Sequence, residues 1–301
     1  METITYGGWK NNLRLANREI ELVVTLDVGP RIIRFGFNGG PNAFKEYSDQ
    51  LGGTSEKEWK IRGGHRLWHA PEAQPRTYFP DNGPVKWQAT ADHGVRLTSR
   101  PETPYGVQKE LDVRLHQDGN RVSLVHRLTN VGPWPVELAA WALTVLAPGG
   151  TEIIPLPGKV PHPQGLLPNQ TLVLWPYADM ADPRFTWGTS YVLVRSVANT
   201  KPTKIGLAHR GGWVAYWREG LLFVKRFAYK EGARYADRGC NFETFTNDEM
   251  LECETLGALV RLEPGQSATH AEEWELFRDV PAVSSESEID RTIRPLAGKK
   301  G

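Results

Sequence analysis

The chain has 301 residues, and its 36 lysines and arginines nearly balance its 35 aspartates and glutamates. This balance argues against a protein that binds nucleic acid or another polyanion, because such proteins carry a basic surplus. The 40% content of hydrophobic residues excludes global disorder, and two cysteines exclude a framework of disulfides. The first residues lack the basic and apolar regions of a signal peptide, and no apolar run is long enough to span a membrane. We therefore expect a cytoplasmic protein, unless a leader has been removed.

Strand patterns dominate the sequence, beginning with the β-branched and apolar residues 19–27 and 30–37. Residues 107–116 and 121–129 alternate apolar and polar side chains on either side of a turn, which predicts a hairpin with one face in solvent. Residues 212–217 and 221–227 predict a second hairpin. Further strands are expected at 136–146, 171–175, 190–197, 203–208, 249–255, 257–263 and 269–277.

Helical periodicity is scarce, and its best example is residues 285–293, where Ser285 and Glu288 fit a capping box. Residues 147–170 are rich in proline and glycine and predict a long loop, as in binding loops and lids. So many antiparallel strands predict an all-β protein, a large two-sheet sandwich rather than a barrel, with its site on a concave sheet. We expect one sandwich domain over residues 1–278 and a C-terminal extension, 279–301, with a short helix and a flexible tail.

The first candidate site segment is residues 62–72, RGGHRLWHAPE. If it is extended, His65 and His69 share one face, and histidine acts as an acid or a base near neutral pH. Arg66 offers a planar fork of donors and Trp68 a flat apolar face. The alternative is a loop whose polar side chains bind backbone carbonyls. A metal held through the His-x3-His spacing is disfavoured, because the flanking Gly-Gly and Pro argue against a helix.

A second candidate segment, residues 240–255, carries Glu243 and then Glu252 and Glu254. On a strand the last two point the same way, and like carboxylates on one face raise each other's pKa, which prepares a general acid or base. The alternative is an edge strand with solvated glutamates. By alternation, Lys225 lies among apolar residues and either faces a site or extends to the sheet edge.

A third segment, residues 159–187, mixes aromatic residues such as Trp175 and Tyr177 with His162 and short polar side chains. This mixture suits sugar rings, whose C–H faces stack on aromatic rings while their hydroxyls need donors and acceptors. The alternative is a proline-rich loop whose aromatic residues close the core. Nucleophile-elbow, phosphate-loop and dinucleotide-binding motifs are absent, which argues against nucleophilic hydrolysis and nucleotide chemistry.

Three stretches of the sequence resemble the galactose mutarotase-like superfamily, which includes the aldose 1-epimerases. Residues 128–150, which begin LTNVG, are similar to its central strand pair, and residues 251–277, which begin LECETLG, to its final strands. Residues 63–72 lie where the epimerases carry their first active-site histidine. The resemblance covers about residues 5–278, and the branch that fits best is an uncharacterised one, DUF4380.

The resemblance implies a β-supersandwich with a carbohydrate site. In aldose epimerases a glutamate takes the proton of the anomeric hydroxyl and a histidine protonates the ring oxygen, so that the ring opens and recloses on its other face. Carried over, Glu254 or Glu252 would be the base and His65 the first histidine. The second histidine of the epimerases has no counterpart, because Ala140-Trp141-Ala142 stands in its place. A histidine from another loop, His162 or His209, would have to replace it.

We therefore expect a sugar-modifying enzyme of the mutarotase type, with His65 and Glu254 as its catalytic pair and no metal or other cofactor. Its partner would be a mono- or oligosaccharide, and neither nucleic acid nor a membrane. The alternatives are a sugar-binding module without activity and a polysaccharide lyase in which Arg66 and Lys225 neutralise a uronate carboxylate. The residues expected to contact the sugar are Arg66, Trp68, His69, Glu72, Trp141, His162, Lys225, Glu243 and Glu252.

Overall fold

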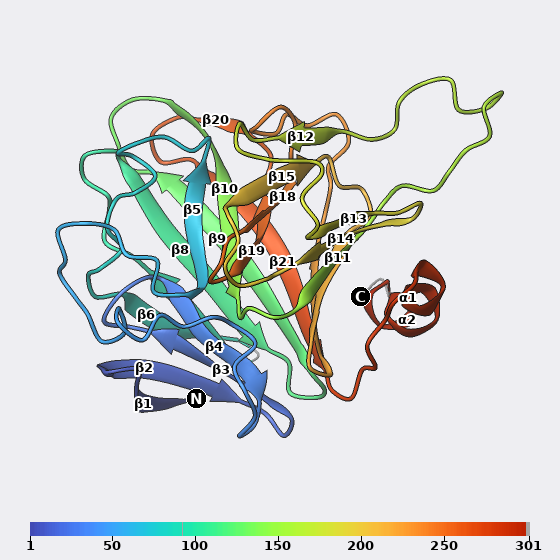
Figure 1. The fold of residues 1–301 in the computed structure, drawn as a ribbon. Helices are drawn as coiled ribbons and strands as arrows, with labels where there is room; N and C mark the ends of the chain where they lie inside the picture. Colours follow the sequence, from blue (N-terminus) through green and yellow to red (C-terminus); the bar gives the residue numbers. More distant parts are fainter. Residues whose placement is uncertain (92, 299–301) are drawn as a thin grey trace.

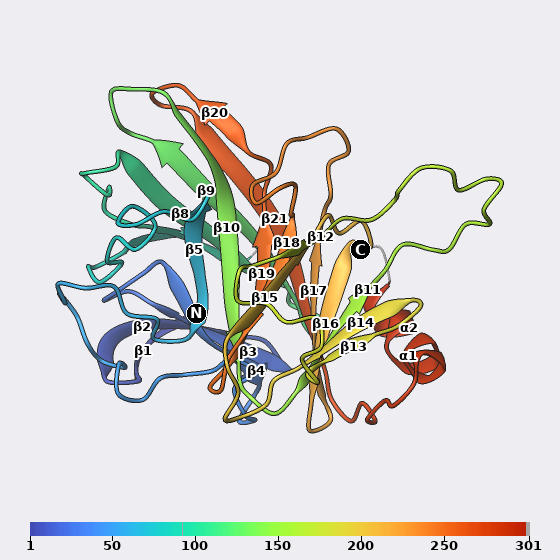
Figure 2. The same cartoon turned by 45° about the horizontal axis from the view of Figure 1, so that its top comes forward.

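The computed structural model describes residues 1–91 and 93–298, which form two large antiparallel sheets packed against each other (Figures 1 and 2). The 11-stranded sheet contains, in spatial order, β1 (Glu2–Tyr6), β2 (Trp9–Ala16), β3 (Ile20–Thr25), β4 (Arg31–Phe37), β5 (Gly64–Ala70), β10 (Val136–Leu146), β19 (Leu251–Leu256), β18 (Phe242–Thr246), β15 (Thr203–Leu207) and β12 (Leu172–Leu174), and β20 (Val260–Leu262) pairs with β10. The predicted all-β sandwich is confirmed.

The second sheet is 10-stranded and begins near the C-terminal helices. Its order is β13 (Phe185–Trp187), β14 (Tyr191–Arg195), β11 (Thr151–Pro155), β16 (Trp213–Arg218), β17 (Leu221–Phe227), β21 (Ser267–Phe277), β9 (Arg121–Asn130), β8 (Val107–Leu115), β7 (Gly94–Thr98) and β6 (Lys86–Thr90). The two predicted hairpins are present as β8–β9 and β16–β17.

The main core lies between the two sheets and is rich in aromatic rings. Phe35 and Phe44, from the side of the 11-stranded sheet, contact Phe223 on β17 and Trp274 on β21 with ring centroids 5.5 to 6.1 Å apart. All four side chains are buried. Edge-on and tilted ring pairs of this kind add to the stability that burial of their area provides.

Three central strands of the 11-stranded sheet determine what each of its faces presents. Across β5, β10 and β19, Arg66, Leu143 and Glu254 form one row of paired residues. The next row contains His65 and Thr144, whose side chains point the opposite way because successive residues of a strand alternate between faces. The first row faces away from the second sheet and the next row faces it.

The predicted loop over residues 147–170 is wrong at its beginning, because β11 occupies Thr151–Pro155. Ile153 and Ile154 are fully buried there, and the strand pairs with β14 and β16. The rest of the segment, up to β12, extends away from the body of the protein (Figure 1). The β-propensity of two isoleucines thus outweighs the surrounding glycines and prolines.

The chain ends in two short helices, α1 (Glu286–Thr292) and α2 (Arg294–Ala297), within the predicted extension. Ser285 caps α1 by accepting a hydrogen bond from the backbone N–H of Glu288. Ile289 and Ala297 are fully buried in a cluster with residues of β16 and β17 on the outer face of the 10-stranded sheet. The flexible tail expected at the very end falls on residues 299–301, outside the described residues.

Within the described residues, no helix has the length and the apolar character needed to cross a membrane.

Candidate functional site

A cavity of about 220 Å³ lies on the outer face of the 11-stranded sheet. Strands β5, β10, β19, β18 and β15 supply part of its lining, and the connecting segments supply the rest. The lining residues are Trp59, Ile61, Arg66, Trp68, Glu72, Tyr78, Trp141, Leu143, Tyr177, Lys204, Phe245, Met250, Glu252 and Glu254. Aromatic and charged side chains dominate this set, as is common in sites that bind small polar molecules.

The centre of the site is a buried cluster around Lys204. Its Nζ lies 2.8 Å from Oε2 of Glu254 and 2.8 Å from Oε2 of Glu243. The indole rings of Trp141 and Trp175 lie beside the ammonium group, with their centroids 4.7 and 4.8 Å away. Trp141 also donates a 2.9 Å hydrogen bond from Nε1 to Oε2 of Glu254. One oxygen of Glu254 is therefore held by two donors.

The charges of this cluster decide where its protons reside. Burial raises the pKa of Glu243 well above its ordinary value and raises that of Glu254, while nearby Lys204 opposes both shifts. Burial alone would lower the pKa of Lys204, but the two carboxylates outweigh it and raise that pKa. One ammonium cannot neutralise two buried carboxylates, so the pair retains a proton. Glu254 also accepts a hydrogen bond from Trp141, which favours its charged form, so we place the shared proton on Glu243.

A second ion pair lies on the same face of the sheet. Arg66 Nη2 is 2.8 Å from Oε1 of Glu252, and the guanidinium lies over the rings of Trp59 and Trp68 at 5.1 and 4.5 Å. Tyr78 contacts both indole rings. Stacking on aromatic faces orients a guanidinium and leaves its edge available for hydrogen bonds.

Several buried polar atoms of the lining residues have no hydrogen-bond partner in the part of the chain that the structure describes. They are Oε1 of Glu254, Nε and Nη1 of Arg66, and the indole nitrogens of Trp59 and Trp68. Buried polar atoms in native proteins are nearly always satisfied by protein, water or ligand. The cavity therefore offers both an acceptor and several donors to a molecule that enters it.

The two segments that the sequence singled out do meet at this cavity. Arg66, Trp68 and Glu72 come from residues 62–72, and Glu252 and Glu254 from residues 240–255. Trp141 lines the cavity as well, and Glu243 lies buried behind Lys204. The expected alternation on β19 is confirmed, because both late glutamates lie on one face.

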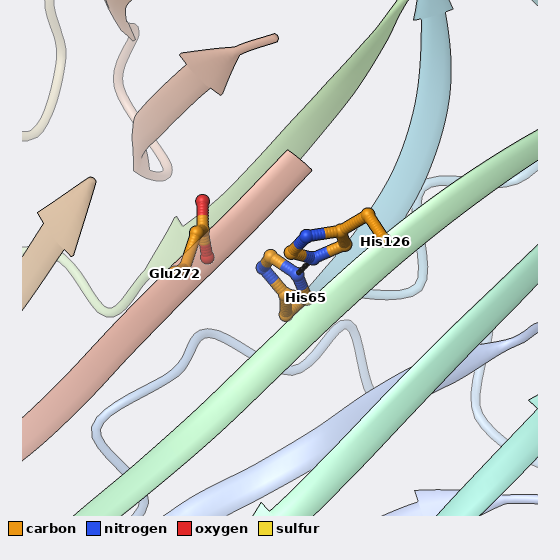
Figure 3. Close-up of side chains that lie close together, drawn as sticks. All are labelled: His65, His126 and Glu272. Atoms are coloured by element: carbon orange, nitrogen blue, oxygen red, sulfur yellow. Dashed lines mark hydrogen bonds between the residues drawn. The ribbon is translucent and has the colours of Figure 1, made fainter. Parts of the chain in front are cut away.

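His65, however, does not reach this cavity, and the expected pairing of His65 with Glu254 across one site is wrong. The row of His65 on β5 faces the second sheet, whereas the row of Glu254 faces away from it. Figure 3 shows His65 beside His126 of β9, with Nε2 of each ring 2.7 Å apart. Nδ1 of His65 lies 2.8 Å from the hydroxyl of Thr144. Because His65 and Arg66 are consecutive residues of a strand, their side chains point to opposite faces of the sheet.

His65 belongs to a network between the sheets whose polar atoms bind one another. His126 Nδ1 lies 3.0 Å from the carbonyl oxygen of His270, which assigns the N–H to Nδ1 and the lone pair to Nε2. His65 Nε2–H then donates to His126 and its Nδ1 accepts from Thr144. Glu272 accepts hydrogen bonds from Thr255 and, at 2.8 Å, from Trp274 Nε1.

Among the described residues, His65, His126 and Glu272 place one ligand-type atom each within 4.8 Å of the others (Figure 3). These atoms are already engaged within the network, and Lys225 Nζ lies 3.1 Å from Oε1 of Glu272. A buried ammonium beside the carboxylate disfavours a second cation. We therefore assign this group a structural role, and a site without metal stays a prediction.

Three further residues expected to contact a sugar lie outside the cavity lining. Lys225 is fully buried between the sheets, where it binds Glu272 and the carbonyl oxygen of Cys253, so it does not extend to the sheet edge. His69 shares the inward face of β5 with His65 and lies near Glu102. His162 is exposed in the segment between β11 and β12.

Lys204, Trp59 and Tyr78 line the cavity but were not among the residues predicted from the sequence. Lys204 was inside a predicted strand, and a lone lysine in the apolar run TKIGL was the signal that could have marked it. Its partners Glu243 and Glu254 follow 39 and 50 residues later, so spacing did not connect them. Trp59 and Tyr78 lie in segments without a repeating pattern.

Comparison with known proteins identifies the fold. The sequence matches no family model and no curated protein. Among solved structures, the Slr1438 protein from Synechocystis sp. PCC 6803 matches with a TM-score of 0.60 and 11% identity, over 92% of this chain and 100% of that one. A galactose mutarotase-like protein from Lactobacillus casei ATCC 334 matches with a TM-score of 0.55 and 9% identity, over 89% and 100%.

A candidate aldose 1-epimerase from Escherichia coli K12 also matches, with a TM-score of 0.57 and 12% identity, over 89% of this chain and 99% of that one. At such identities the likeness shows the fold. The chain therefore has the galactose mutarotase-like fold, as the sequence predicted. Its assignment to the DUF4380 branch stays a prediction.

Proposed function

We propose that this protein binds an aldose in the cavity on the outer face of the 11-stranded sheet and interconverts its anomers. The observation that carries the proposal is the state of Glu254, whose Oε2 is held by Trp141 and Lys204 while Oε1 has no partner in the described chain. A carboxylate that is oriented through one oxygen and open at the other is suited to accept a proton. Its raised pKa brings it nearer to the working pH of a general base.

The walls of the cavity suit a sugar ring. Trp59, Trp68 and Trp141 supply flat apolar faces, and the unpartnered indole N–H groups and the Arg66 guanidinium supply donors for hydroxyls. Solved neighbours that share the fold include proteins named for galactose mutarotase and aldose 1-epimerase. The sugar is proposed on these grounds, together with the resemblance of the late acidic strand.

The mechanism needs a proton donor other than His65. We assign this role to Lys204, which lines the cavity and has the protonated Glu243 within 2.8 Å. Glu254 takes the proton of the anomeric hydroxyl, its O–H electrons form the C1=O bond, and the bond from C1 to the ring oxygen breaks. Lys204 donates a proton to the ring oxygen as it takes one from Glu243, so it remains an ammonium and the proton comes in net from Glu243. Rotation about C1–C2 and reversal of these transfers give the other anomer.

The test follows the optical rotation of freshly dissolved α-anomers of several aldoses with purified protein. Acceleration that is lost in Glu254→Gln supports the proposal. Glu137→Gln, a change at an exposed strand residue paired with Arg234, is the matched control and should keep the full rate. Saturable quenching of tryptophan fluorescence without acceleration for any aldose would show a binding module instead. Growth of ultraviolet absorbance with uronate polymers would show a lyase.

A further inference from the structure

A second cavity, of about 470 Å³, lies beside the first and is larger. Two loops supply most of its lining, residues 79–83 and 99–103, and Lys109 of β8 reaches it from the 10-stranded sheet. Residues 56–57 line this cavity, whereas residues 59 and 61 of the same segment line the first. Likewise, Tyr78 lines the first cavity and the next residue, Phe79, lines the second. The two cavities are therefore neighbours across shared loops.

A buried polar cluster borders this second cavity. Lys109 Nζ lies 2.5 Å from Oε1 of Glu102, and Oε2 of Glu102 lies 3.6 Å from Nε2 of His69. The last distance is too long for a hydrogen bond. Lys109 is 2% exposed, Glu102 is 3% exposed and His69 is fully buried. The loop, β8 and β5 thus bring three functional groups together that the catalytic proposal does not use.

Polar atoms of this cluster lack hydrogen-bond partners in the described structure, whereas those of the histidine network between the sheets bind one another. Among the described residues, no hydrogen-bond partner exists for Oε2 of Glu102 or for either ring nitrogen of His69. Lys109 Nζ has its ion pair and no well-directed hydrogen bond. Lys109 and Glu102 both line the cavity. Buried polar atoms that are left open at the edge of a cavity require water or a ligand.

We propose that this cavity is a second binding site, for a neutral polyhydroxylated ligand, the chemical class of sugars and cyclitols. A hydroxyl group both donates and accepts, so one hydroxyl can donate to Glu102 Oε2 and another can accept from Lys109. A charged ligand would oppose one member of the existing Lys109–Glu102 pair. Two exposed cations, Lys57 and Arg100, also line the cavity, so sulfate is the probe for the competing possibility of an anion site. Phe79 and two prolines, Pro80 and Pro101, provide apolar faces for the C–H side of the ring.

The other two carboxylates at this cavity, those of Asp81 and Glu56, are each paired with an arginine. Asp81 forms a 3.1 Å ion pair with Arg31, and Glu56 a 2.6 Å ion pair with Arg62. Both carboxylates are therefore neutralised from outside the cavity lining. The proposal does not depend on catalysis at Glu254, because it rests on a separate set of residues.

Gly83 provides a way to block this site without disturbing the fold. A Cβ added at Gly83 would meet nothing within 4 Å, and Gly83 lines the cavity. Gly158, in the segment after β11, is equally open and lies at a different pocket, so Gly158→Phe is the matched control for Gly83→Phe. Both changes are made in a Trp68→Ala background, which removes one aromatic side chain from the first cavity and so weakens binding there.

Isothermal titration with methyl α-glucoside and myo-inositol, neither of which can mutarotate, measures the affinity of the second site. We expect binding in the Gly158→Phe protein and a loss of about tenfold or more in the Gly83→Phe protein. Glu102→Gln should weaken binding as well, because the amide no longer offers a full carboxylate acceptor. Near-ultraviolet circular dichroism checks that each variant is folded.

Three results would overturn this proposal: equal affinity in the two glycine variants, a preference for sulfate over the neutral probes, or no binding of either neutral probe. Failure of the catalytic proposal looks different, since it is read from optical rotation in the Glu254→Gln protein. If the protein accelerates mutarotation but does not bind the neutral probes at the second cavity, only the proposal of a second site fails. If it binds the probes but does not accelerate mutarotation, only the catalytic proposal fails.

Discussion

The two faces of β5, β10 and β19 carry two polar clusters that differ in how their atoms are used. On the outer face, Arg66 and Glu254 have buried polar atoms at a cavity for which the described residues offer no hydrogen-bond partner. On the inner face, the ring nitrogens of His65 and His126 are bound to neighbouring groups in a fully buried position. Adjacent residues of the same strands thus line a cavity on one side and hold the two sheets together on the other.

The difference teaches that a histidine in a polar segment is not by itself a sign of chemistry. A functional side chain must have an atom that is open to a partner, and His65 has none in the described structure. We therefore expect substitutions on the outer face to lower the activity of the folded protein, whatever they cost in stability. Substitutions on the inner face should lower stability and leave the activity of the folded protein unchanged.

The largest effect on activity is expected for Lys204→Met. Without the ammonium, the pKa of Glu254 rises further and its base form is depleted at neutral pH, so sugar ring opening should slow by about 10²- to 10⁴-fold. The residual rate should recover only in part as the pH is raised, because the base form of Glu254 returns while the proposed proton donor is missing, and a simple loss of structure would give no such recovery. The measurement is the pH profile of optical rotation, with the exposed Lys201→Met as control.

The largest effect on stability is expected for Lys225→Met. The change leaves the buried carboxylate of Glu272 without its 3.1 Å ion-pair partner, and removing one member of such a pair costs about 3–5 kcal/mol. Urea denaturation measures the loss. Anomer exchange by the fraction that remains folded should be unchanged, and a rate that falls in step with stability would contradict the division between the faces.

A smaller effect concerns pH and His270, which lies on β21 beside His126 in the network between the sheets. Burial lowers the pKa of His270 to about 3, so the unfolded chain takes up a proton below about pH 6.5 while the folded protein does not. Stability from this residue is present above that pH and decreases by about 1.4 kcal/mol for each unit below it. Relative to His270→Gln, the wild-type free energy of unfolding should therefore decrease between pH 6.5 and 4.

Glu243 on the outer face should act with the opposite sign. Its pKa is raised by burial, so the folded protein holds a proton that the unfolded chain releases above about pH 4.5. Relative to Glu243→Gln, the wild-type protein should lose stability as the pH rises from 4.5 toward neutrality. Urea midpoints at several pH values measure this slope, and slopes of the same sign for both variants would refute the comparison.

No measurable effect is expected for His162→Ala. His162 is exposed on the segment between β11 and β12 and does not line the first cavity. Surface substitutions of this kind change stability by no more than about 0.5 kcal/mol. A clear fall in sugar affinity or in anomer exchange would show that this segment reaches the site during the reaction.

The fold could be predicted because alternation is clear where one sheet face meets solvent. In β8 and β9 buried positions alternate with partly exposed ones, and both strands were expected within one residue of their bounds. The face of β5 could not be predicted in the same way. All seven of its residues are buried, so hydrophobicity carries no alternation to show whether His65 or Arg66 faces the site.

Only part of the site could be predicted, because strand pairing brings together residues that are far apart in the sequence. The pairing of β5 with β10 and of β10 with β19 brings Arg66 and Glu254 into one row, although 188 residues separate them in the sequence. Resemblance to a family suggested that these segments meet, and the structure places both at the first cavity. The cytoplasmic location, the single domain over residues 1–278 and the absence of nucleic-acid partners stay predictions.

The two C-terminal helices have a consequence for work with shortened forms of the protein. None of their residues lines the cavity at Glu254, yet Ile289 and Ala297 cover apolar residues of β16 and β17. A chain cut after residue 278 would retain every residue of the proposed site and expose an apolar patch that includes Trp213 and Leu222. Such a fragment is expected to aggregate through this patch, and the aggregation could be misread as a folding defect of the β-sandwich.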